Sequence, residues 1–104
     1  MRIELRTDGD IEGHDELARY VETVVTTAVE HDIAQVTRVD ARIGGVSSAP
    51  QRGVDDICCI LEAKLEVLHP IVVTHQASTV HETVRGAAAK LKHAINQALG
   101  RSTR

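Results

Sequence analysis

The sequence contains no phenylalanine and no tryptophan, and Tyr20 is its only aromatic residue. This argues against a site built from stacked rings, including the aromatic platforms that hold single-stranded RNA. The core must instead be built from valine, isoleucine, leucine and alanine. A chain of 104 residues has room for one such core, so we expect residues 1–104 to form a single domain.

The sequence also lacks long apolar runs, and it lacks cysteines spaced to form a disulfide or a metal site. No run approaches the roughly 18 residues of a membrane-spanning helix, and MRIELRTDGD lacks the apolar stretch of a secretory signal. We therefore expect a cytoplasmic protein with no membrane contact. Cys58 and Cys59 are the only cysteines, and as neighbours in a predicted strand they point to opposite faces. Neither a shared metal ion nor an easy disulfide is expected of them.

Motifs that carry catalysis are absent as well. The chain has no G-x-S-x-G, H-E-x-x-H or C-x-x-C pattern and no glycine-rich phosphate loop. Its six histidines include no pair at the i, i+4 spacing that places two imidazoles on one metal ion. The sequence therefore predicts no catalytic residue, no metal site, no cofactor and no enzymatic activity.

Acidic and basic residues are distributed unevenly along the chain. Residues 1–56 carry twelve acidic and six basic side chains, whereas residues 57–104 carry three acidic and six basic ones. The first part thus has a net charge of -6, the second +3, and the chain -3. This asymmetry favours a polyanionic partner for the second part. The alternative is that the two parts attract each other and need no partner.

Hydrophobic periodicity predicts four strands and two helices. Alternation of period two indicates strands, and apolar residues every three or four positions indicate helices. The strands are expected at 1–7, 36–43, 57–67 and 71–77, and the helices at 14–31 and 80–99. The order β-α-β-β-β-α and the one-sided apolar faces predict an α+β fold, in which both helices pack on one face of a four-stranded sheet. This is a two-layer sandwich like that of double-stranded RNA-binding domains. The first helix should connect two parallel strands, and an antiparallel meander should follow.

Several positions have a predicted place in these elements. Thr79 and Glu82 have the spacing of a capping box at the start of the last helix, and Gly100 is a natural stop. Gly86, in the middle of that helix, suggests close packing against a neighbour. The apolar face of the helix is expected to comprise Val80, Val84, Ala87, Ala88, Leu91, Ile95, Ala98 and Leu99.

Alternation also assigns the two faces of the sheet. We expect an inner row in the second strand that comprises Thr37, Val39, Ala41 and Ile43, and one in the third that comprises Cys59, Leu61, Ala63, Leu65 and Val67. The outer face should be charged and paired across strands, with basic Arg2, Arg6, Arg38, Arg42 and Lys64 among acidic Glu4, Asp40, Glu62 and Glu66.

The last helix carries a basic stripe. Arg85, Lys92 and Asn96 follow spacings of seven and four, which places them along one side. His81 lies above them, and Lys90, Gln97 and Arg101 lie at the flanks. These residue types bind phosphate oxygens. A solvated helix face, or one that pairs with the acidic part of the chain, would show the same pattern.

The order of elements and four stretches resemble the ribosome hibernation-promoting factor family, also called ribosome-associated inhibitor A or sigma-54 modulation proteins. The stretches are MRIELRT, HDELARYVETVV, DIAQVTRVDARI and IVVTHQASTVHETVRGAAAKLKHAI, which together span nearly the whole chain. The resemblance is to the short form of the family, which lacks the additional C-terminal domain that pairs ribosomes.

This resemblance implies a non-enzymatic protein that binds the RNA and proteins of the small ribosomal subunit. Such a protein blocks translation under stress by occupying the channel of messenger and transfer RNA. The implied RNA-binding residues are Arg85, Lys90, Lys92 and Arg101, together with Arg19, the only basic residue on the exposed side of the first helix. Because family members present several basic residues from both helices, weaker binding is expected here. The protein would be a monomer or weak homodimer. The alternative is a module of the same fold that binds or dimerises with proteins, and not ribosomes.

Overall fold

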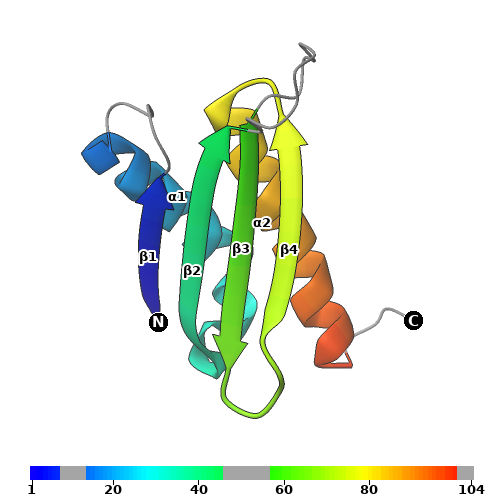
Figure 1. The fold of residues 1–104 in the computed structure, drawn as a ribbon. Helices are drawn as coiled ribbons and strands as arrows, with labels where there is room; N and C mark the ends of the chain where they lie inside the picture. The colour runs from blue at the N-terminus through cyan, green and yellow to red at the C-terminus, as the bar shows by residue number, and fades with distance from the viewer. Residues whose placement is uncertain (8–13, 46–56, 101–104) are drawn as a thin grey trace.

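Two helices cover the same face of a four-stranded sheet (Figure 1). This is a computed structural model that describes residues 1–7, 14–45 and 57–100. The predicted order β-α-β-β-β-α and the α+β class are confirmed. The elements are β1 (Arg2–Thr7), α1 (His14–Ala28), the 3₁₀ helix η1 (Glu30–Gln35), β2 (Val36–Gly45), β3 (Ile57–Leu65), β4 (Ile71–Ala77) and α2 (Val80–Ala98).

The strands lie in the sheet in chain order, β1-β2-β3-β4. β1 and β2 are parallel, with α1 between them in the chain, and the pairs β2–β3 and β3–β4 are antiparallel. Leu5 lies opposite Ala41, and Ala41 lies opposite Leu61. Because facing residues in neighbouring strands share a side of the sheet, this register collects the apolar positions on the side that the helices cover.

The core lies between the sheet and the helices and is aliphatic, as the composition requires. Its fully buried side chains include Ile43 and Leu61 from the sheet, and Leu91 and Ile95 from α2. α1 contributes Leu17, Val21 and Val25, with Tyr20 half-buried at the margin. The predicted apolar face of α2 is confirmed except for Ala98, which is exposed, and Thr83 joins it. The hydroxyl of Thr83 can be buried because it donates a 2.6 Å hydrogen bond to the Thr79 carbonyl.

The first helix is shorter than its periodicity predicts. It ends at Ala28, and the chain continues as η1 and not as an α-helix to His31. The amide of Asp32 donates to the Val29 carbonyl at 2.8 Å, which is the i→i−3 bond of a 3₁₀ turn. Val29 and Val36 are both buried. The 3₁₀ turns of η1 shorten the connection between Val29 and Val36, so that both side chains reach the core.

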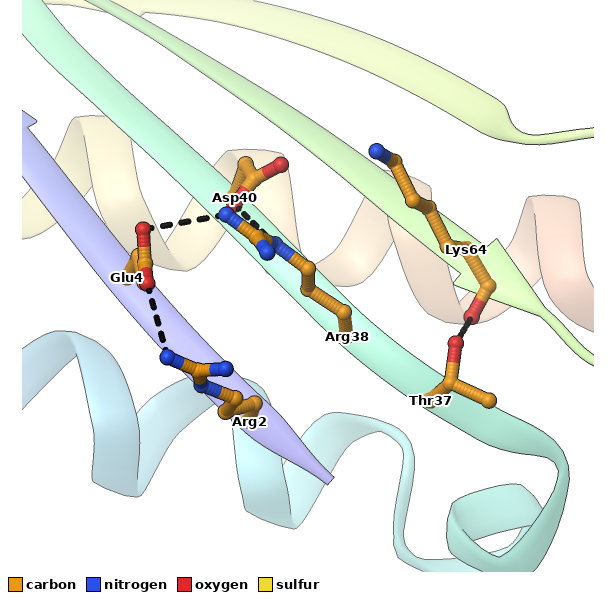
Figure 2. A network of polar contacts seen from close by, with 6 residues as sticks. All are labelled: Arg2, Glu4, Thr37, Arg38, Asp40 and Lys64. Carbon is orange, nitrogen blue, oxygen red and sulfur yellow. Dashed lines mark hydrogen bonds and ion pairs between the residues drawn. The ribbon is translucent and has the colours of Figure 1, made fainter.

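Two residues at strand ends contradict the predicted alternation. The pairing of β2 with β3 shifts between Val36 and Arg38, and this bulge leaves Thr37 exposed while Val36 is buried. The Thr37 hydroxyl donates to the Lys64 carbonyl at 2.9 Å (Figure 2). Val67 is also exposed, because β3 ends at Leu65. Alternation beyond a strand end no longer determines the direction of a side chain.

The predicted signals at the ends of α2 have their expected roles. The Thr79 side chain accepts a 3.1 Å hydrogen bond from the Glu82 amide, as an N-cap residue does. The Glu82 carboxylate accepts from the Ser78 hydroxyl at 3.5 Å, so its partner differs from that of a standard capping box. At the other end Gly100 has a φ of 76°, which favours glycine.

Gly86 lets β4 and α2 approach closely. A Cβ added there would overlap the His75 ring, because the Cδ2, Nε2 and Cε1 atoms would all lie closer to it than van der Waals contact allows. The predicted close packing at Gly86 is therefore confirmed, and its neighbour is an imidazole on the helix-facing side of β4.

The two cysteines lie on opposite faces of β3, as predicted. Cys59 is fully buried in the core, and Cys58 is partly exposed on the open face of the sheet. Burial, with a smaller contribution from Cys58, raises the pKa of Cys59 from 9.0 to about 12. Its thiol is therefore protonated and unreactive at neutral pH. Because this pKa is higher in the folded chain, the contribution of Cys59 to stability falls as the pH rises from about 9 to about 12.

We expect a thiol-specific reagent such as DTNB to modify one cysteine of the native protein at pH 8. Cys58 should react at once, and Cys59 only after guanidinium unfolds the chain, because the reagent requires an accessible thiolate. Absorbance of the released thionitrobenzoate counts the modified thiols. Cys58→Ser should abolish the fast phase, and rapid modification of both cysteines in the native protein would contradict the assignment.

Candidate nucleic-acid interface

Arg85 and Lys92 share one side of α2. Both are exposed, and seven helical residues bring them back to within about 20° of each other around the axis. His81 lies on the same side, and its ring packs against Tyr20 of α1, with centroids 4.3 Å apart and planes inclined by 42°. The basic side of α2 therefore borders α1. It consists of Arg85 and Lys92, which follow His81 along the helix.

Lys90 lies on the other flank of α2. It precedes Lys92 by two positions in the sequence, which is about 200° around the helix. Its Nζ donates a 2.8 Å hydrogen bond to the Thr74 carbonyl in β4. Because β4 is an edge strand, Lys90 satisfies a carbonyl that would otherwise be open to another chain. The structure thus does not bring Lys90 together with Arg85 and Lys92.

Of the remaining two predicted residues, the structure describes only Arg19. Arg19 is exposed on α1, on the side of that helix opposite to the buried Leu17 and Val21. Its exposed neighbours on the helix include Asp15, Glu16 and Glu22, so the α1 surface stays predominantly acidic. Arg101 lies outside the described residues.

The α2 cations have no acidic partner in the part of the chain that the structure describes. The three ion pairs found there join Arg2 to Glu4, Arg38 to Glu4 and Arg38 to Asp40, and all are in the sheet. Arg85 and Lys92 take part in none of them. Pairing with the acidic part of the chain therefore does not explain the basic stripe among residues 1–7, 14–45 and 57–100, and both charges remain available to an external anion.

The open face of the sheet is charged, but in rows of like charge. Strand register places Arg2 opposite Arg38 and Arg38 opposite Lys64, then Glu4 opposite Asp40 and Asp40 opposite Glu62, then Arg6 opposite Arg42. The expectation of opposite charges facing each other across strands is therefore wrong for directly opposite positions. The ion pairs run along a strand or diagonally between strands (Figure 2).

Arg38 joins the first two rows. Its Nε donates to Asp40 Oδ1 at 2.8 Å and its Nη2 to Glu4 Oε1 at 3.0 Å (Figure 2). The hydrogen bond and the charge of Asp40, followed by the charge of Glu4, raise the already high pKa of Arg38. Because Arg2 also pairs with Glu4, two guanidinium groups together balance two carboxylates of the acidic row.

Groups that could support other chemistry do not converge in the described ranges. No three histidine, cysteine, aspartate or glutamate side chains there are placed to hold a metal ion. No helix in these ranges is both long and apolar enough to cross a membrane. What the described surface offers chemically is exposed guanidinium and ammonium groups, which bind anions.

Two solved structures have the same arrangement of helices and strands. One is a ribosomal subunit interface protein from Coxiella burnetii, with a TM-score of 0.76 and 12% sequence identity over 95% of this chain and 98% of that one. The other is the N-terminal domain of Thermus thermophilus Protein Y, with a TM-score of 0.68 and 10% identity over 93% and 94%. The fold is that of the hibernation-promoting factor family. The resemblance predicted from the sequence is thereby confirmed at the level of the fold.

No protein-family model matches the chain, and no curated protein matches it. At 10–12% identity the hibernation-factor fold is shared, whereas individual contact residues cannot be transferred from one chain to another. The charged positions must therefore be judged from their own geometry.

Proposed function

We propose that this protein is a non-enzymatic, ribosome-associated factor. The observation that carries the proposal is the likeness of its fold to two solved chains of the hibernation-promoting factor family, one of them an N-terminal domain, over nearly the whole of each chain. One of these is itself a ribosomal subunit interface protein. Arg85 and Lys92 on α2, which have no ion-pair partner among the described residues, support a partner made largely of RNA, because a phosphate backbone binds such cations directly.

In this proposal the basic side of α2 contacts ribosomal RNA of the small subunit. Arg85 and Lys92 form the centre of the contact, and Lys90, Arg19 and Arg101 act at its margins. The bound protein occupies the channel of messenger and transfer RNA and so inhibits translation under stress. The mechanism is occupancy, which requires no catalytic group and no cofactor, and it places the protein in the cytoplasm.

The number of cations on α2 predicts a weak complex. Each phosphate contact adds about 0.9 to the slope of log Kobs against log salt on the duplex-DNA scale. Two central contacts should therefore give a slope of roughly 2, with small additions from the margins. Binding should be clear at low salt and moderately reduced at physiological salt.

Neutralising the two central residues should abolish most ribosome binding. We expect the double variant Arg85→Gln/Lys92→Gln to cosediment with small subunits at least tenfold more weakly, because two charge-assisted hydrogen bonds are lost at about 1.5–3 kcal/mol each. The measurement is cosedimentation of the untagged protein with purified bacterial subunits and whole ribosomes across a salt series.

The matched control is Arg2→Gln/Lys64→Gln, which removes the same charge from the open face of the sheet, where both side chains are exposed. It should cosediment like the original protein. Equal binding by the α2 variant would contradict the assigned site. Absence of binding by the original protein at low salt would contradict the function, and light scattering would then test the alternative of a dimerising module.

A further inference from the structure

Arg6 and Arg42 lie side by side on the face of the sheet that the helices leave open. They are directly opposite each other in the parallel pair β1–β2, where neighbouring strands are about 4.8 Å apart. Both are exposed. Within the described ranges neither makes an ion pair or a side-chain hydrogen bond, whereas Arg38, two residues before Arg42, is bound to Glu4 and Asp40.

The sheet, and not the helices, carries the positive excess of the ordered elements. The four strands contain five basic and three acidic residues, a net charge of +2. The helices α1 and α2 contain four of each and are neutral overall. Arg2 and Arg38 pair with Glu4 and Asp40, and Lys64 offsets the charge of Glu62 on the same strand, so the excess of two charges lies at Arg6 and Arg42 at one end of the open face.

The surface around Arg42 is hollowed on both sides. One hollow of about 200 Å³ is lined by Arg6 and Arg42 together with Glu4, Asp40 and Glu62. The second, of about 280 Å³, is lined among the described residues by Arg42, Gly44, Gly45 and Cys58 with Ile43 and Ile60. Arg42 lines both hollows, so an anion held by the two arginines can extend from the first hollow to the second, where the glycines allow it to approach the backbone.

The chemistry of this surface fits a phosphodiester. Two adjacent guanidinium groups can each present a fork of N–H donors to phosphate oxygens. No aromatic residue lies on the strands, since Tyr20 is in α1, so bases cannot stack there as they do on the sheets of RNA-binding domains. Binding would be directed to the backbone and independent of base sequence.

We propose that Arg6 and Arg42 bind the phosphate backbone of RNA on the open face of the sheet, as a second RNA contact on the opposite side of the molecule from α2. The choice of RNA rests on the proposed function, whereas the phosphate site rests on the arginine pair. Because α2 and the open face of the sheet would each contact RNA, the protein would lie between two RNA segments and not on the surface of one.

Cys58 provides a local measurement of this contact. Cys58 lies on β3 opposite Gly44, which is the next outward-facing position of β2 after Arg42. Cys58 and Arg42 both line the second hollow. We expect a single-stranded oligouridine RNA at low salt to slow alkylation of Cys58 at least threefold in the original protein. The same protection should appear in Arg85→Gln/Lys92→Gln, which retains the sheet contact. It should disappear in Arg6→Gln/Arg42→Gln, and the control Arg2→Gln/Lys64→Gln should behave like the original protein.

Fluorescence anisotropy of the labelled RNA across a salt series gives the second readout. Losing two contacts in Arg6→Gln/Arg42→Gln should lower the slope of log Kobs against log salt by about 1.4, at roughly 0.7 for each contact with a single strand. Arg2→Gln/Lys64→Gln should leave the slope unchanged. A decrease confined to the arginine pair supports the assigned contact.

Three results would overturn the proposal: alkylation of Cys58 at the same rate with saturating RNA, an unchanged salt slope in Arg6→Gln/Arg42→Gln, or protection by oligoglutamate and none by RNA. The last result would identify a site for acidic protein segments. Ribosome cosedimentation separates this failure from that of the proposed function. A protein that binds ribosomes through Arg85 and Lys92 but shows no protection of Cys58 retains the function and lacks the second contact.

Discussion

Leu91→Ala should lower the free energy of unfolding by about 2–5 kcal/mol, the usual range for a leucine removed from a packed core. Leu91 is fully buried in α2, in the layer between helix and sheet. Its loss leaves a cavity among aliphatic side chains, none of which is large enough to fill it. Urea unfolding followed by far-ultraviolet circular dichroism measures the change at a constant m-value.

The conservative variant Leu91→Met keeps the volume of the side chain and should cost less than about 1.5 kcal/mol. Since a small domain has a total free energy of unfolding of about 5–15 kcal/mol, the alanine variant should remain folded at low temperature but lose a large part of that free energy. A decrease below 1 kcal/mol for Leu91→Ala would show that the helix is not packed on the sheet as described.

Gly86→Val should destabilise the protein by about 1–3 kcal/mol through overpacking against β4. The new Cβ would overlap the His75 ring, so the ring or the helix has to move. Valine has a higher helix propensity than glycine by only roughly half a kcal/mol, which offsets part of this cost. Thermal and urea unfolding of the variant measure the net effect.

Two further variants separate steric overlap from helix propensity. Ala89→Val places the same side chain at an exposed position of α2 and should cost only about 0.5 kcal/mol. Adding His75→Ala to Gly86→Val removes the overlapping ring and should restore most of the lost stability, a coupling that a double-mutant cycle quantifies. An unaltered loss in the double variant would mean that His75 does not occupy the space beside Gly86.

Local sequence patterns predicted much of the fold. Period-two alternation predicted β4 at its observed bounds, and the apolar spacing of three and four identified Leu17, Val21 and Val25 as the buried face of α1. These predictions succeed because burial on one side of an element imposes its period directly on the sequence. Thr79 and Gly100 were recognisable for a similar reason, since a cap depends on the chemistry of one or two residues.

The errors occur where a tertiary contact competes with the local pattern. Thr37 fits the inward alternation of β2, yet a bulge against β3 turns it outward. The stretch after Ala28 continues the helical spacing, yet burial of Val29 and Val36 favours a 3₁₀ turn. Neither the register of a partner strand nor the position of the core is encoded in the spacing of nearby residues.

The candidate site divides in the same way. Spacing alone placed Arg85 and Lys92 on one side of α2, because helical geometry determines the angle between them. It did not reveal that Lys90 bonds to the Thr74 carbonyl, or that Arg6 and Arg42 are adjacent and without an ion-pair partner in the described ranges. The alternation of arginines and acids along each strand was visible, but which charges face each other depends on register.

By itself, then, the sequence determined the type and order of the elements, the aliphatic character of the core and the basic side of α2. These depend on interactions between residues close together in the chain, or on composition. Only the tertiary structure decided that like charges form rows across the sheet, that Arg2 and Arg38 pair with Glu4 and Asp40, and that the positive excess remains at Arg6 and Arg42. The rows arise between strands whose facing charged residues are more than twenty residues apart in the chain, and electrostatic interaction depends on distance in space and not along the chain.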